Sequence, residues 1–253
     1  MVVTGGGAGI GKALCERFHR EGAKAVVVVD RDGARAADVA KSIGGTAMTA
    51  DVTVQADVTR VVEETESRVG PIGLFCSNAG VLFTDPDWDD AASDSVDNWM
   101  RGWSLHVMAH VFAAKALIPR FKARGGGHFL QTISAAGLLS AIGGGVYSTT
   151  KHAAIGFAEH LAITHREHKI GVSILCPQAV DTDMIRGADK AAALKDGVLS
   201  TEAVADAVMR GLAEDRFLIL PHPDVLGYMQ KKTADYDRWI AGMVRLRQAP
   251  RPG

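Results

Sequence analysis

At 253 residues and 47% apolar content, the chain can bury one large core, which favours a single domain over residues 1–253. Its formal net charge of −1 carries no basic stripe, which argues against a nucleic-acid or anionic-membrane partner. Cys15, Cys76 and Cys176 lie far apart without metal or redox spacing, and no apolar run approaches the roughly 20 residues that span a bilayer. We therefore expect a soluble, cytoplasmic protein that begins without a leader.

Short β-rich apolar runs alternate with helical stretches along the chain, without an internal repeat. We expect strands near residues 1–4, 24–30, 46–50, 72–76, 128–133, 170–176 and 216–220. Strands separated by helices need right-handed crossovers, so the predicted fold class is α/β. It is a single doubly wound Rossmann-like domain, with a seven-stranded parallel sheet and helices on both faces, whose ligands bind at the carboxyl ends of the strands. The first run is short for a central strand, which leaves open whether residues precede Met1.

A glycine-rich segment, Gly5–Gly11, follows the first strand and leads into an amphipathic helix. Strand, glycine turn and helix start together predict a site for a diphosphate, because unpaired N–H groups and the positive end of the helix dipole point at the ligand. Such turns are common, so this signal is weak by itself.

Asp30 ends the second strand about 20 residues after the glycine turn, the position of a carboxylate that accepts from adenosine ribose hydroxyls. A carboxylate there would repel a 2′-phosphate, so the sequence favours NAD over NADP. Arg31 next to it could stack on adenine or pair with that phosphate, which keeps NADP open. Asp30 could also be an ordinary helix cap before Asp32 and Gly33.

Tyr147 and Lys151 lie four residues apart in a run that we expect to be helical from 147 to 170, so they share one face. An ammonium beside a phenol favours the phenolate, and lowering the phenol pKa by about three units takes about 4 kcal/mol. Tyr147 is therefore a candidate acid/base. Ser134, thirteen residues upstream of Tyr147, ends the fifth strand, where it could simply cap a turn.

Together these segments resemble the short-chain dehydrogenase/reductase family over nearly the whole chain, and several matches in order carry more weight than any one motif. The turn T-G-x-x-x-G-x-G corresponds to Thr4, Gly5, Gly9 and Gly11, the acidic residue after the second strand to Asp30, and the adenine-contacting pair to Asp51 and Val52. The N-N-A-G motif reads Ser77, Asn78, Ala79 and Gly80, the catalytic serine is Ser134, Y-x-x-x-K is Tyr147 and Lys151, and P-G-x-V-x-T runs from Pro177 to Thr182.

The resemblance implies an NAD-dependent oxidoreductase that interconverts a secondary alcohol and a ketone. Ser134 would hold the substrate oxygen, Tyr147 would transfer the proton, Lys151 would also bind the nicotinamide ribose, and Thr182 the carboxamide. The catalytic candidates are Ser134, Tyr147, Lys151 and His106. The cofactor-binding candidates are Gly5, Gly9, Ile10, Gly11, Asp30, Arg31, Asp51, Val52, Asn78, Ala79, Gly80, Tyr147, Lys151, Pro177, Val180 and Thr182.

The chain departs from the family at His106, where Asn is usual. In the family that Asn helps to hold a water on a proton path from the Lys. His106 could do the same, relay protons itself with a pKa near 6.5, or only pack in its helix. His106 and His110 have helical spacing, but no acidic residue or Cys matches it, so we expect no metal. Ser77 and Gln178 also replace family residues, without removing a chemical group that reacts.

The expected substrate residues are apolar, with no Arg or Lys aimed at an anion, which favours a bulky, neutral, hydrophobic alcohol or ketone over a sugar phosphate or hydroxy acid. They are Trp88, Leu138, Leu139, Ile142, Met184 and Ile185. Residues 183–200, with Gly187 and Gly197, could form a mobile lid or an ordinary surface loop.

Residues 224–247 are expected to form one C-terminal helix with an apolar stripe: Leu226, Met229, Tyr236, Ile240 and Met243. The stripe could pack on its own core. Because family members are usually dimers or tetramers, we expect instead that the helix reaches a neighbour, in a homotetramer or homodimer.

Three other functions stay open. The protein could be an NADPH-dependent carbonyl reductase, or a cofactor-binding regulatory protein with little turnover. It could also act without redox chemistry on a halogenated or epoxide substrate, although relatives of that type typically lose the cofactor turn and the Lys.

Overall fold

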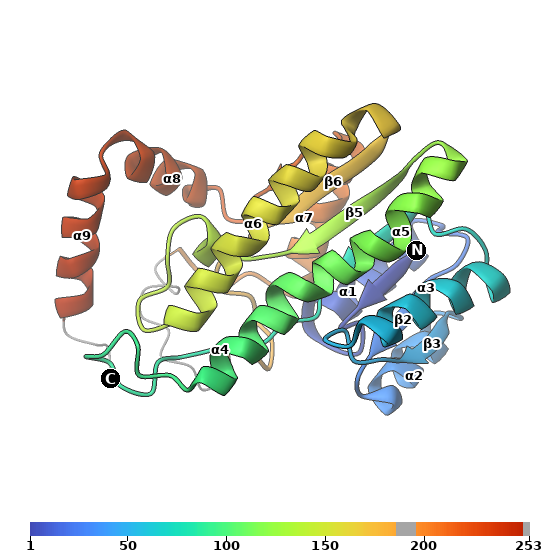
Figure 1. Cartoon of the computed structure of the whole chain (residues 1–253), viewed down its shortest axis with the longest axis horizontal. Helices are drawn as coiled ribbons and strands as arrows, with labels where there is room; N and C mark the ends of the chain where they lie inside the picture. The colour runs from blue at the N-terminus through green and yellow to red at the C-terminus, as the bar shows by residue number, and fades with distance from the viewer. Residues whose placement is uncertain (186–195, 250–253) are drawn as a thin grey trace.

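Runs of β-branched residues form a parallel sheet in the computed structural model, which describes residues 1–185 and 196–249 (Figure 1). The seven strands lie in the order β3-β2-β1-β4-β5-β6-β7, so successive strands are added on one side of β1 up to β3 and on its other side from β4 onward. The strands are β1 Val2–Thr4, β2 Val27–Asp30, β3 Thr46–Thr49, β4 Leu74–Ser77, β5 Gly127–Thr132, β6 Ile170–Leu175 and β7 Leu218–Ile219. All six pairings are parallel, which confirms the predicted sheet.

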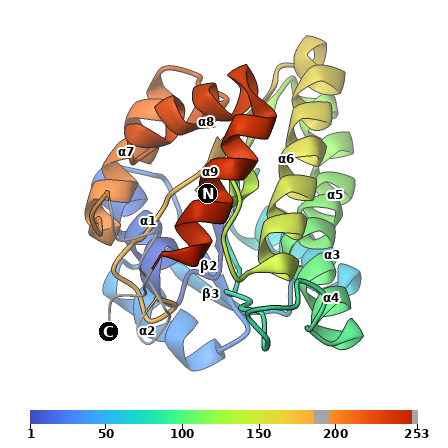
Figure 2. The ribbon, with the colours of Figure 1, turned by 90° about the vertical axis from the view of Figure 1, so that its left-hand side faces the viewer.

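Alternate strand residues enter two separate cores, one on each face of the sheet. Val2, Val27 and Val29 pack with helices α3 (Gln55–Arg68), α5 (Ala109–Arg124) and α6 (Gly145–His165). Val3 and Val28 pack with helices α1 (Gly9–Arg20), α2 (Gly33–Ser42) and α7 (Thr201–Ala213). Figure 2 shows these two helix layers with the sheet between them, as the doubly wound prediction requires.

Helix α4 (Val96–Trp103) continues through a π-helical segment, Ser104–Met108, into α5. The expected helix over 147–170 proved shorter at its carboxyl end. Helix α6 ends at His165, a 3₁₀ turn covers Arg166–His168, and Lys169 turns the chain with a left-handed φ of 54°. The chain must leave the helix there because strand β6 begins at the next residue.

The single C-terminal helix expected over 224–247 is in fact two helices, α8 (Asp224–Ala234) and α9 (Tyr236–Gln248). Asp235 between them is extended, with φ −155° and ψ 97°, and its side chain accepts the Arg238 N–H at 2.9 Å. An aspartate in this role starts a new helix, so α9 turns away from α8. In Figure 1 the strand arrows point toward α9, which stands apart from the sheet.

Among the helices that the structure describes, none is both long and apolar enough to cross a membrane. Cys15, Cys76 and Cys176 are buried free thiols.

Candidate active site

The carboxyl ends of the strands open into a cavity of about 1580 Å³. A cavity for one small ligand usually measures roughly 300–1,000 Å³, so this one has room for two molecules. The turn after β1, the ends of the central strands, α8 and α9 all contribute to its wall. Every cofactor-binding candidate lines it except Gly11; the catalytic candidates Ser134, Tyr147 and Lys151 line it, and His106 does not.

The glycine turn brings backbone close to backbone at the start of α1. Gly9 has a left-handed φ of 51°, and a Cβ on Gly11 would collide with the carbonyl oxygen of Gly5. Ala8 precedes α1 without a side-chain cap, so the first N–H groups of the helix remain open toward the cavity. This cradle fits the diphosphate of a dinucleotide.

Asp30 is held at the cavity edge by two backbone groups. The Gly7 N–H donates to its Oδ2 at 3.0 Å, and the Asp32 N–H donates to its Oδ1 at 3.0 Å. The carboxylate keeps further lone pairs for ribose hydroxyls. Arg31 and Arg35 line the cavity with it, and Arg35 also pairs with Asp32 at 3.4 Å. Arg35 was missed in the sequence, and helical spacing could not have indicated it, because Arg31 precedes helix α2.

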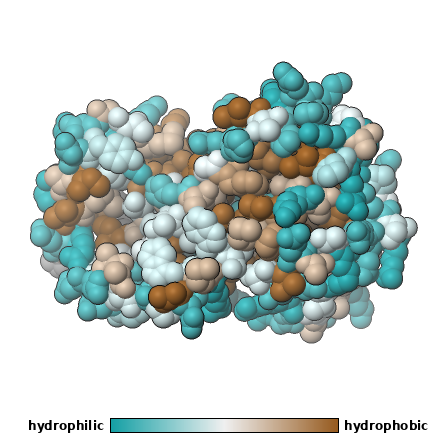
Figure 3. Space-filling view, viewed as in Figure 1, coloured by the Kyte–Doolittle hydropathy of each residue, from teal (hydrophilic) through white to brown (hydrophobic). Residues whose placement is uncertain are grey.

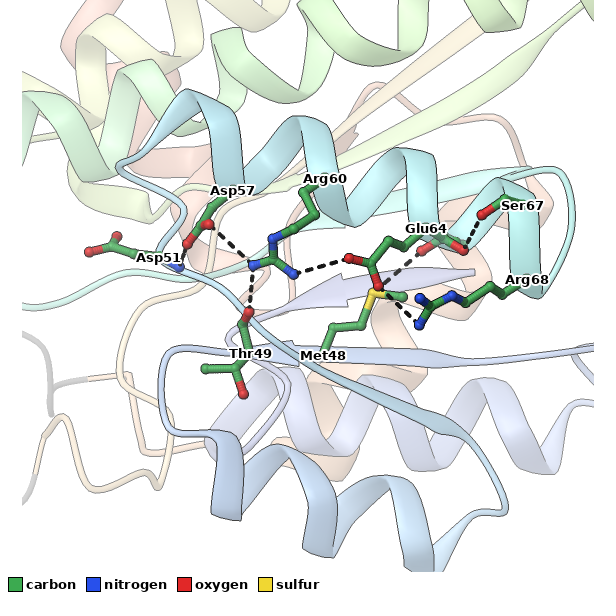
Figure 4. A network of polar contacts seen from close by, with 9 residues as sticks. Met48, Thr49, Asp51, Asp57, Arg60, Glu64, Ser67 and Arg68 are labelled. Carbon is green, nitrogen blue, oxygen red and sulfur yellow. Dashed lines mark hydrogen bonds and ion pairs between the residues drawn. The ribbon is translucent and has the colours of Figure 1, made fainter.

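Asp51 is positioned by helix α3, as Figure 4 shows. Its N–H donates to Asp57 Oδ2 at 2.8 Å, and Thr53 donates to its Oδ1 through N–H at 2.9 Å and Oγ1 at 2.7 Å. Arg60 links Asp57, at 3.1 Å, to the last carbonyl of β3, at 2.9 Å. The loop that carries Asp51 and Val52 into the cavity is thus tied at both ends.

Asn78 joins the end of β4 to the end of β1. Its N–H donates to Thr4 Oγ1 at 3.0 Å, and its Nδ2 donates to the Thr4 carbonyl at 3.1 Å. A Cβ on Gly80 would lie 3.7 Å from both Lys151 Nζ and His106 Nε2. The segment after β4 therefore passes directly beside Lys151.

Ser134 lies two residues after the end of β5, and its hydroxyl fixes the start of the next turn. The oxygen accepts the Ala136 N–H at 3.1 Å and donates to the Pro177 carbonyl at 3.4 Å. Ser134 caps the turn, as one sequence interpretation had it, and also lines the cavity.

Tyr147 and Lys151 stand one turn apart on α6, with Lys151 Nζ 5.5 Å from the centre of the Tyr147 ring. The ammonium donates to the Thr132 carbonyl at 3.4 Å, a long bond that leaves donors for a ligand. Such a group fits ribose hydroxyls. Helical spacing predicted this shared face correctly.

The pKa values differ from the expectation that Lys151 brings Tyr147 toward neutrality. Burial raises the pKa of Tyr147, and the Ser134 hydroxyl opposes that rise without cancelling it. Burial lowers the pKa of Lys151 to about 8. Desolvation is the largest cause of both pKa shifts, because burial penalises the charged form of each group. Tyr147 is therefore a neutral phenol at neutral pH in the free protein.

His106 is 1% exposed and carries two hydrogen bonds that fix a neutral ring. Its Nε2 accepts the Val81 N–H at 3.3 Å, so Nδ1 bears the proton and donates to Thr150 Oγ1 at 2.9 Å. Thr150 in turn donates to the Val146 carbonyl at 2.8 Å. Burial, followed by the charge of Lys151, lowers the pKa of His106 to about 2. This geometry does not support a relay that titrates near 6.5.

The segment after β6 borders the glycine turn and α8. Thr182 Cγ2 would lie 3.1 Å from a Cβ on Gly9, which places Thr182 against the cofactor cradle. Gln178, in place of the motif glycine, donates through Nε2 to Asp196 Oδ2 at 3.0 Å, and Tyr228 donates to Asp196 Oδ1 at 2.9 Å. The replacement thus ties this segment to α8, which the sequence alone did not indicate.

The expected substrate residues divide into two groups. Leu139, Ile142, Met184 and Ile185 line the cavity. Trp88 and Leu138 do not belong to the lining. The Trp88 ring covers Gly143, and the Leu138 side chain packs on the core formed with α8.

The cavity wall also contains cations that were not among the expected substrate residues. Lys231 on α8, and Arg238 and Arg245 on α9, contribute to the cavity wall. The three cations were not predicted as cavity residues, because the apolar stripe indicated one continuous helix in this region. The signal that was available is the regular spacing of seven between the three cations.

The expected lid over 183–200 includes Gly187 and other positions at 186–195 that lie outside the described residues. In the described part, Val180 pairs with Leu199 in an isolated bridge, and Gly197 has a left-handed φ of 87°. Among the described residues, no three His, Cys, Asp or Glu side chains gather as a metal site.

The sequence profile of the short chain dehydrogenase family matches residues 1–193. A 1-deoxy-11-beta-hydroxypentalenate dehydrogenase from Streptomyces exfoliatus is 36% identical over 233 residues, covering 88% of this chain and 82% of the relative. Epidermal retinol dehydrogenase 2 from Mus musculus is 28% identical, covering 87% of this chain and 73% of the relative. The crystal structure of a short chain dehydrogenase/reductase from Burkholderia phymatum in complex with NAD has a TM-score of 0.82 at 26% identity, covering 100% of this chain and 95% of that one.

Proposed function

Because this chain belongs to the short-chain dehydrogenase family, we propose that it interconverts a bulky hydrophobic secondary alcohol and its ketone with NAD as the cofactor. Membership makes the protein an oxidoreductase, and its relatives are named as dehydrogenases of a hydroxypentalenate and of retinol. The observation that carries the proposal is that Ser134, Tyr147 and Lys151 line the same cavity as the open diphosphate cradle.

Each of the three side chains has a distinct task in this proposal. Ser134 and Tyr147 hold the substrate oxygen, and Lys151 binds the ribose nearest the reacting carbon and adds positive charge beside Tyr147. The nicotinamide, when bound, accepts hydride from the alcohol carbon or returns it to the ketone.

Proton transfer belongs to Tyr147 in both directions. For ketone reduction, the phenol donates its proton to the carbonyl oxygen, and burial keeps it protonated at neutral pH. For alcohol oxidation, Tyr147 must first lose that proton in order to accept the one from the alcohol hydroxyl. Oxidation should therefore speed up with rising pH, and reduction should slow down.

The preference for NAD rests on Asp30, whose carboxylate is fixed at the cavity edge by backbone N–H groups. Arg31 and Arg35 line the same region and favour the second candidate, an NADPH-dependent reductase. We give Asp30 more weight because a fixed carboxylate repels a 2′-phosphate, whereas Arg35 is already paired with Asp32.

We also propose a homodimer or homotetramer in the cytoplasm. Val96, Met100 and Trp103 form a stripe on α4 with exposed fractions of 75%, 59% and 42%. Tyr236 and Ile240 are similarly exposed on α9, and brown side chains interrupt the hydrophilic surface on that side of the molecule (Figure 3). Exposed apolar stripes favour contact with a second copy, and free cysteines favour a reducing compartment.

Cofactor turnover tests the proposal. The absorbance of reduced nicotinamide should change when NADH is mixed with hydrophobic ketones, or NAD with the matching alcohols. A preference for NADPH and NADP would mean that Arg31 and Arg35, and not Asp30, determine which cofactor binds. Bound cofactor without turnover on the whole panel would favour a regulatory protein, and absence of any binding would overturn the proposal.

A further inference from the structure

Helix α9 lies beyond the carboxyl ends of the strands (Figures 1 and 2), and its residues contribute to the cavity wall. One end of α9 is held where Trp239 packs against the cluster that contains Ala135, the residue after Ser134. At its other end, Arg247 donates to the Trp88 carbonyl at 2.6 Å. Trp88 covers Gly143, four residues before Tyr147. Both attachments flank the catalytic residues, so α9 faces the substrate half of the cavity.

Arg238 and Arg245 project from the cavity face of α9. They are seven residues apart, which places them on one face of the helix and about 10.5 Å apart along its axis. Gly242 lies between them on that face and lines the cavity, and Arg245 Nη2 is 3.8 Å from the position of a Cβ on Gly242. Arg245 therefore bends back toward Arg238 over a glycine that leaves room for a ligand.

Neither arginine is paired with an acidic side chain in the described part of the protein. In the part of the chain that the structure describes, no carboxylate lies within ion-pair distance of Arg238, Arg245 or Lys231. Arg238 lies in the first turn of α9, where the helix dipole disfavours a cation. The nearby lining carboxylates are already engaged, since Asp235 caps α9 and Asp196 accepts from two side chains.

We infer that Arg238 and Arg245 bind an anionic group of the substrate, so that the substrate is a hydrophobic alcohol or ketone that also bears a carboxylate. The inference rests on the proposed function, because the hydroxyl must reach Tyr147 while the carboxylate reaches α9. Guanidinium groups match carboxylates through paired hydrogen bonds, and the apolar lining between the two ends suits a hydrocarbon skeleton. The neutral substrate expected from the sequence is replaced by an amphipathic one.

Matched acids and esters test this inference. We would use bicyclic and tricyclic hydroxy acids, such as 6-hydroxydecalin-2-carboxylate, each paired with its methyl ester. Binding is measured by calorimetry with the full chain, and turnover is measured separately with NAD. The wild-type protein should bind the acid more tightly than the ester, with about a ten- to hundredfold advantage. Added salt should weaken the binding of the acid and leave the binding of the ester unchanged.

Substitutions then identify the residues that bind the carboxylate of the ligand. Arg238→Gln and Arg245→Gln should each lose most of the preference for the acid while the affinity for the ester is unchanged, and Arg245→Lys should keep part of it. Arg210→Gln is the matched control, because Arg210 is an exposed arginine outside the cavity lining. Acid binding no tighter than ester binding across the panel, or equal losses for both ligands in the variants, would overturn the inference. Acid binding that depends on Arg245 without turnover would refute the proposed function alone.

Discussion

His106 offers a sharp test, because a buried neutral histidine makes stability depend on pH in a calculable way. In the unfolded chain its pKa is near 6.5, and in the folded protein burial lowers it to about 2. Between these two pKa values the unfolded state binds a proton that the folded state does not bind. The contribution of His106 to the free energy of unfolding is therefore fully present above pH 6.5 and is lost as the pH falls below it. Between about pH 7.5 and about pH 5.5 this one ring should remove about 1.4 kcal/mol of the free energy of unfolding. Any folded pKa below about 4.5 gives the same figure.

Urea unfolding followed by tryptophan fluorescence at the two pH values measures this effect. His106→Asn should reduce the pH dependence by about 1.4 kcal/mol relative to the wild type. His160→Asn, at an exposed position on α6, is the control and should leave it unchanged. The low-pH limb of the rate profile should also be the same in His106→Asn and wild type. Equal losses of stability in the two proteins, or a shifted limb, would refute the reasoning and restore a proton relay.

Three further substitutions test the rest of the site. Tyr147→Phe should lower kcat by about 10² to 10⁴-fold while NAD binding, measured by calorimetry, persists. Near wild-type turnover would remove Tyr147 from its role. Asp30→Asn should raise the ratio of kcat/KM for NADP over NAD by about tenfold, since it removes a like-charge contact worth about 1 kcal/mol or more. Lys232 is 6% exposed and donates to the Leu138 and Leu139 carbonyls at 2.8 and 3.0 Å and to a side chain of α6. Lys232→Met should therefore destabilise the fold by about 2 kcal/mol in urea, whereas exposed Lys231→Met should change it by less than about 0.5 kcal/mol. Equal effects of the two lysine substitutions on stability would contradict a stabilising role for the buried hydrogen bonds of Lys232.

Local spacing accounts for the parts of the site that could be predicted. The strand ends and the four-residue spacing of Tyr147 and Lys151 depend on backbone geometry alone, so the sequence placed them at one edge of the sheet. The pKa of Tyr147 could not be predicted in this way, because it depends on burial by segments distant in the chain. The same holds for His106, whose partners come from the segment after β4 and from α6.

In the C-terminal region the hydrophobic pattern of the sequence does not predict the break between α8 and α9 or the contacts that these helices make. The apolar stripe continues across Asp235, so hydrophobic periodicity cannot locate the break, whereas the side-chain cap of Asp235 does. Once α9 starts a new direction, Arg238 and Arg245 line the cavity while they remain exposed. Lys232 is buried against carbonyls more than 90 residues earlier in the sequence, a contact that only the folded chain reveals.

Transfer of a labelled hydride tests the central claim most directly. The protein would be incubated with NAD and a hydrophobic secondary alcohol that carries deuterium on the alcohol carbon, and the nucleotide would be analysed by mass spectrometry. We expect reduced NAD that contains the deuterium, together with the matching ketone. Bound NAD that stays unlabelled and oxidised, across alcohols with and without a carboxylate, would contradict the assignment of this cavity to alcohol oxidation.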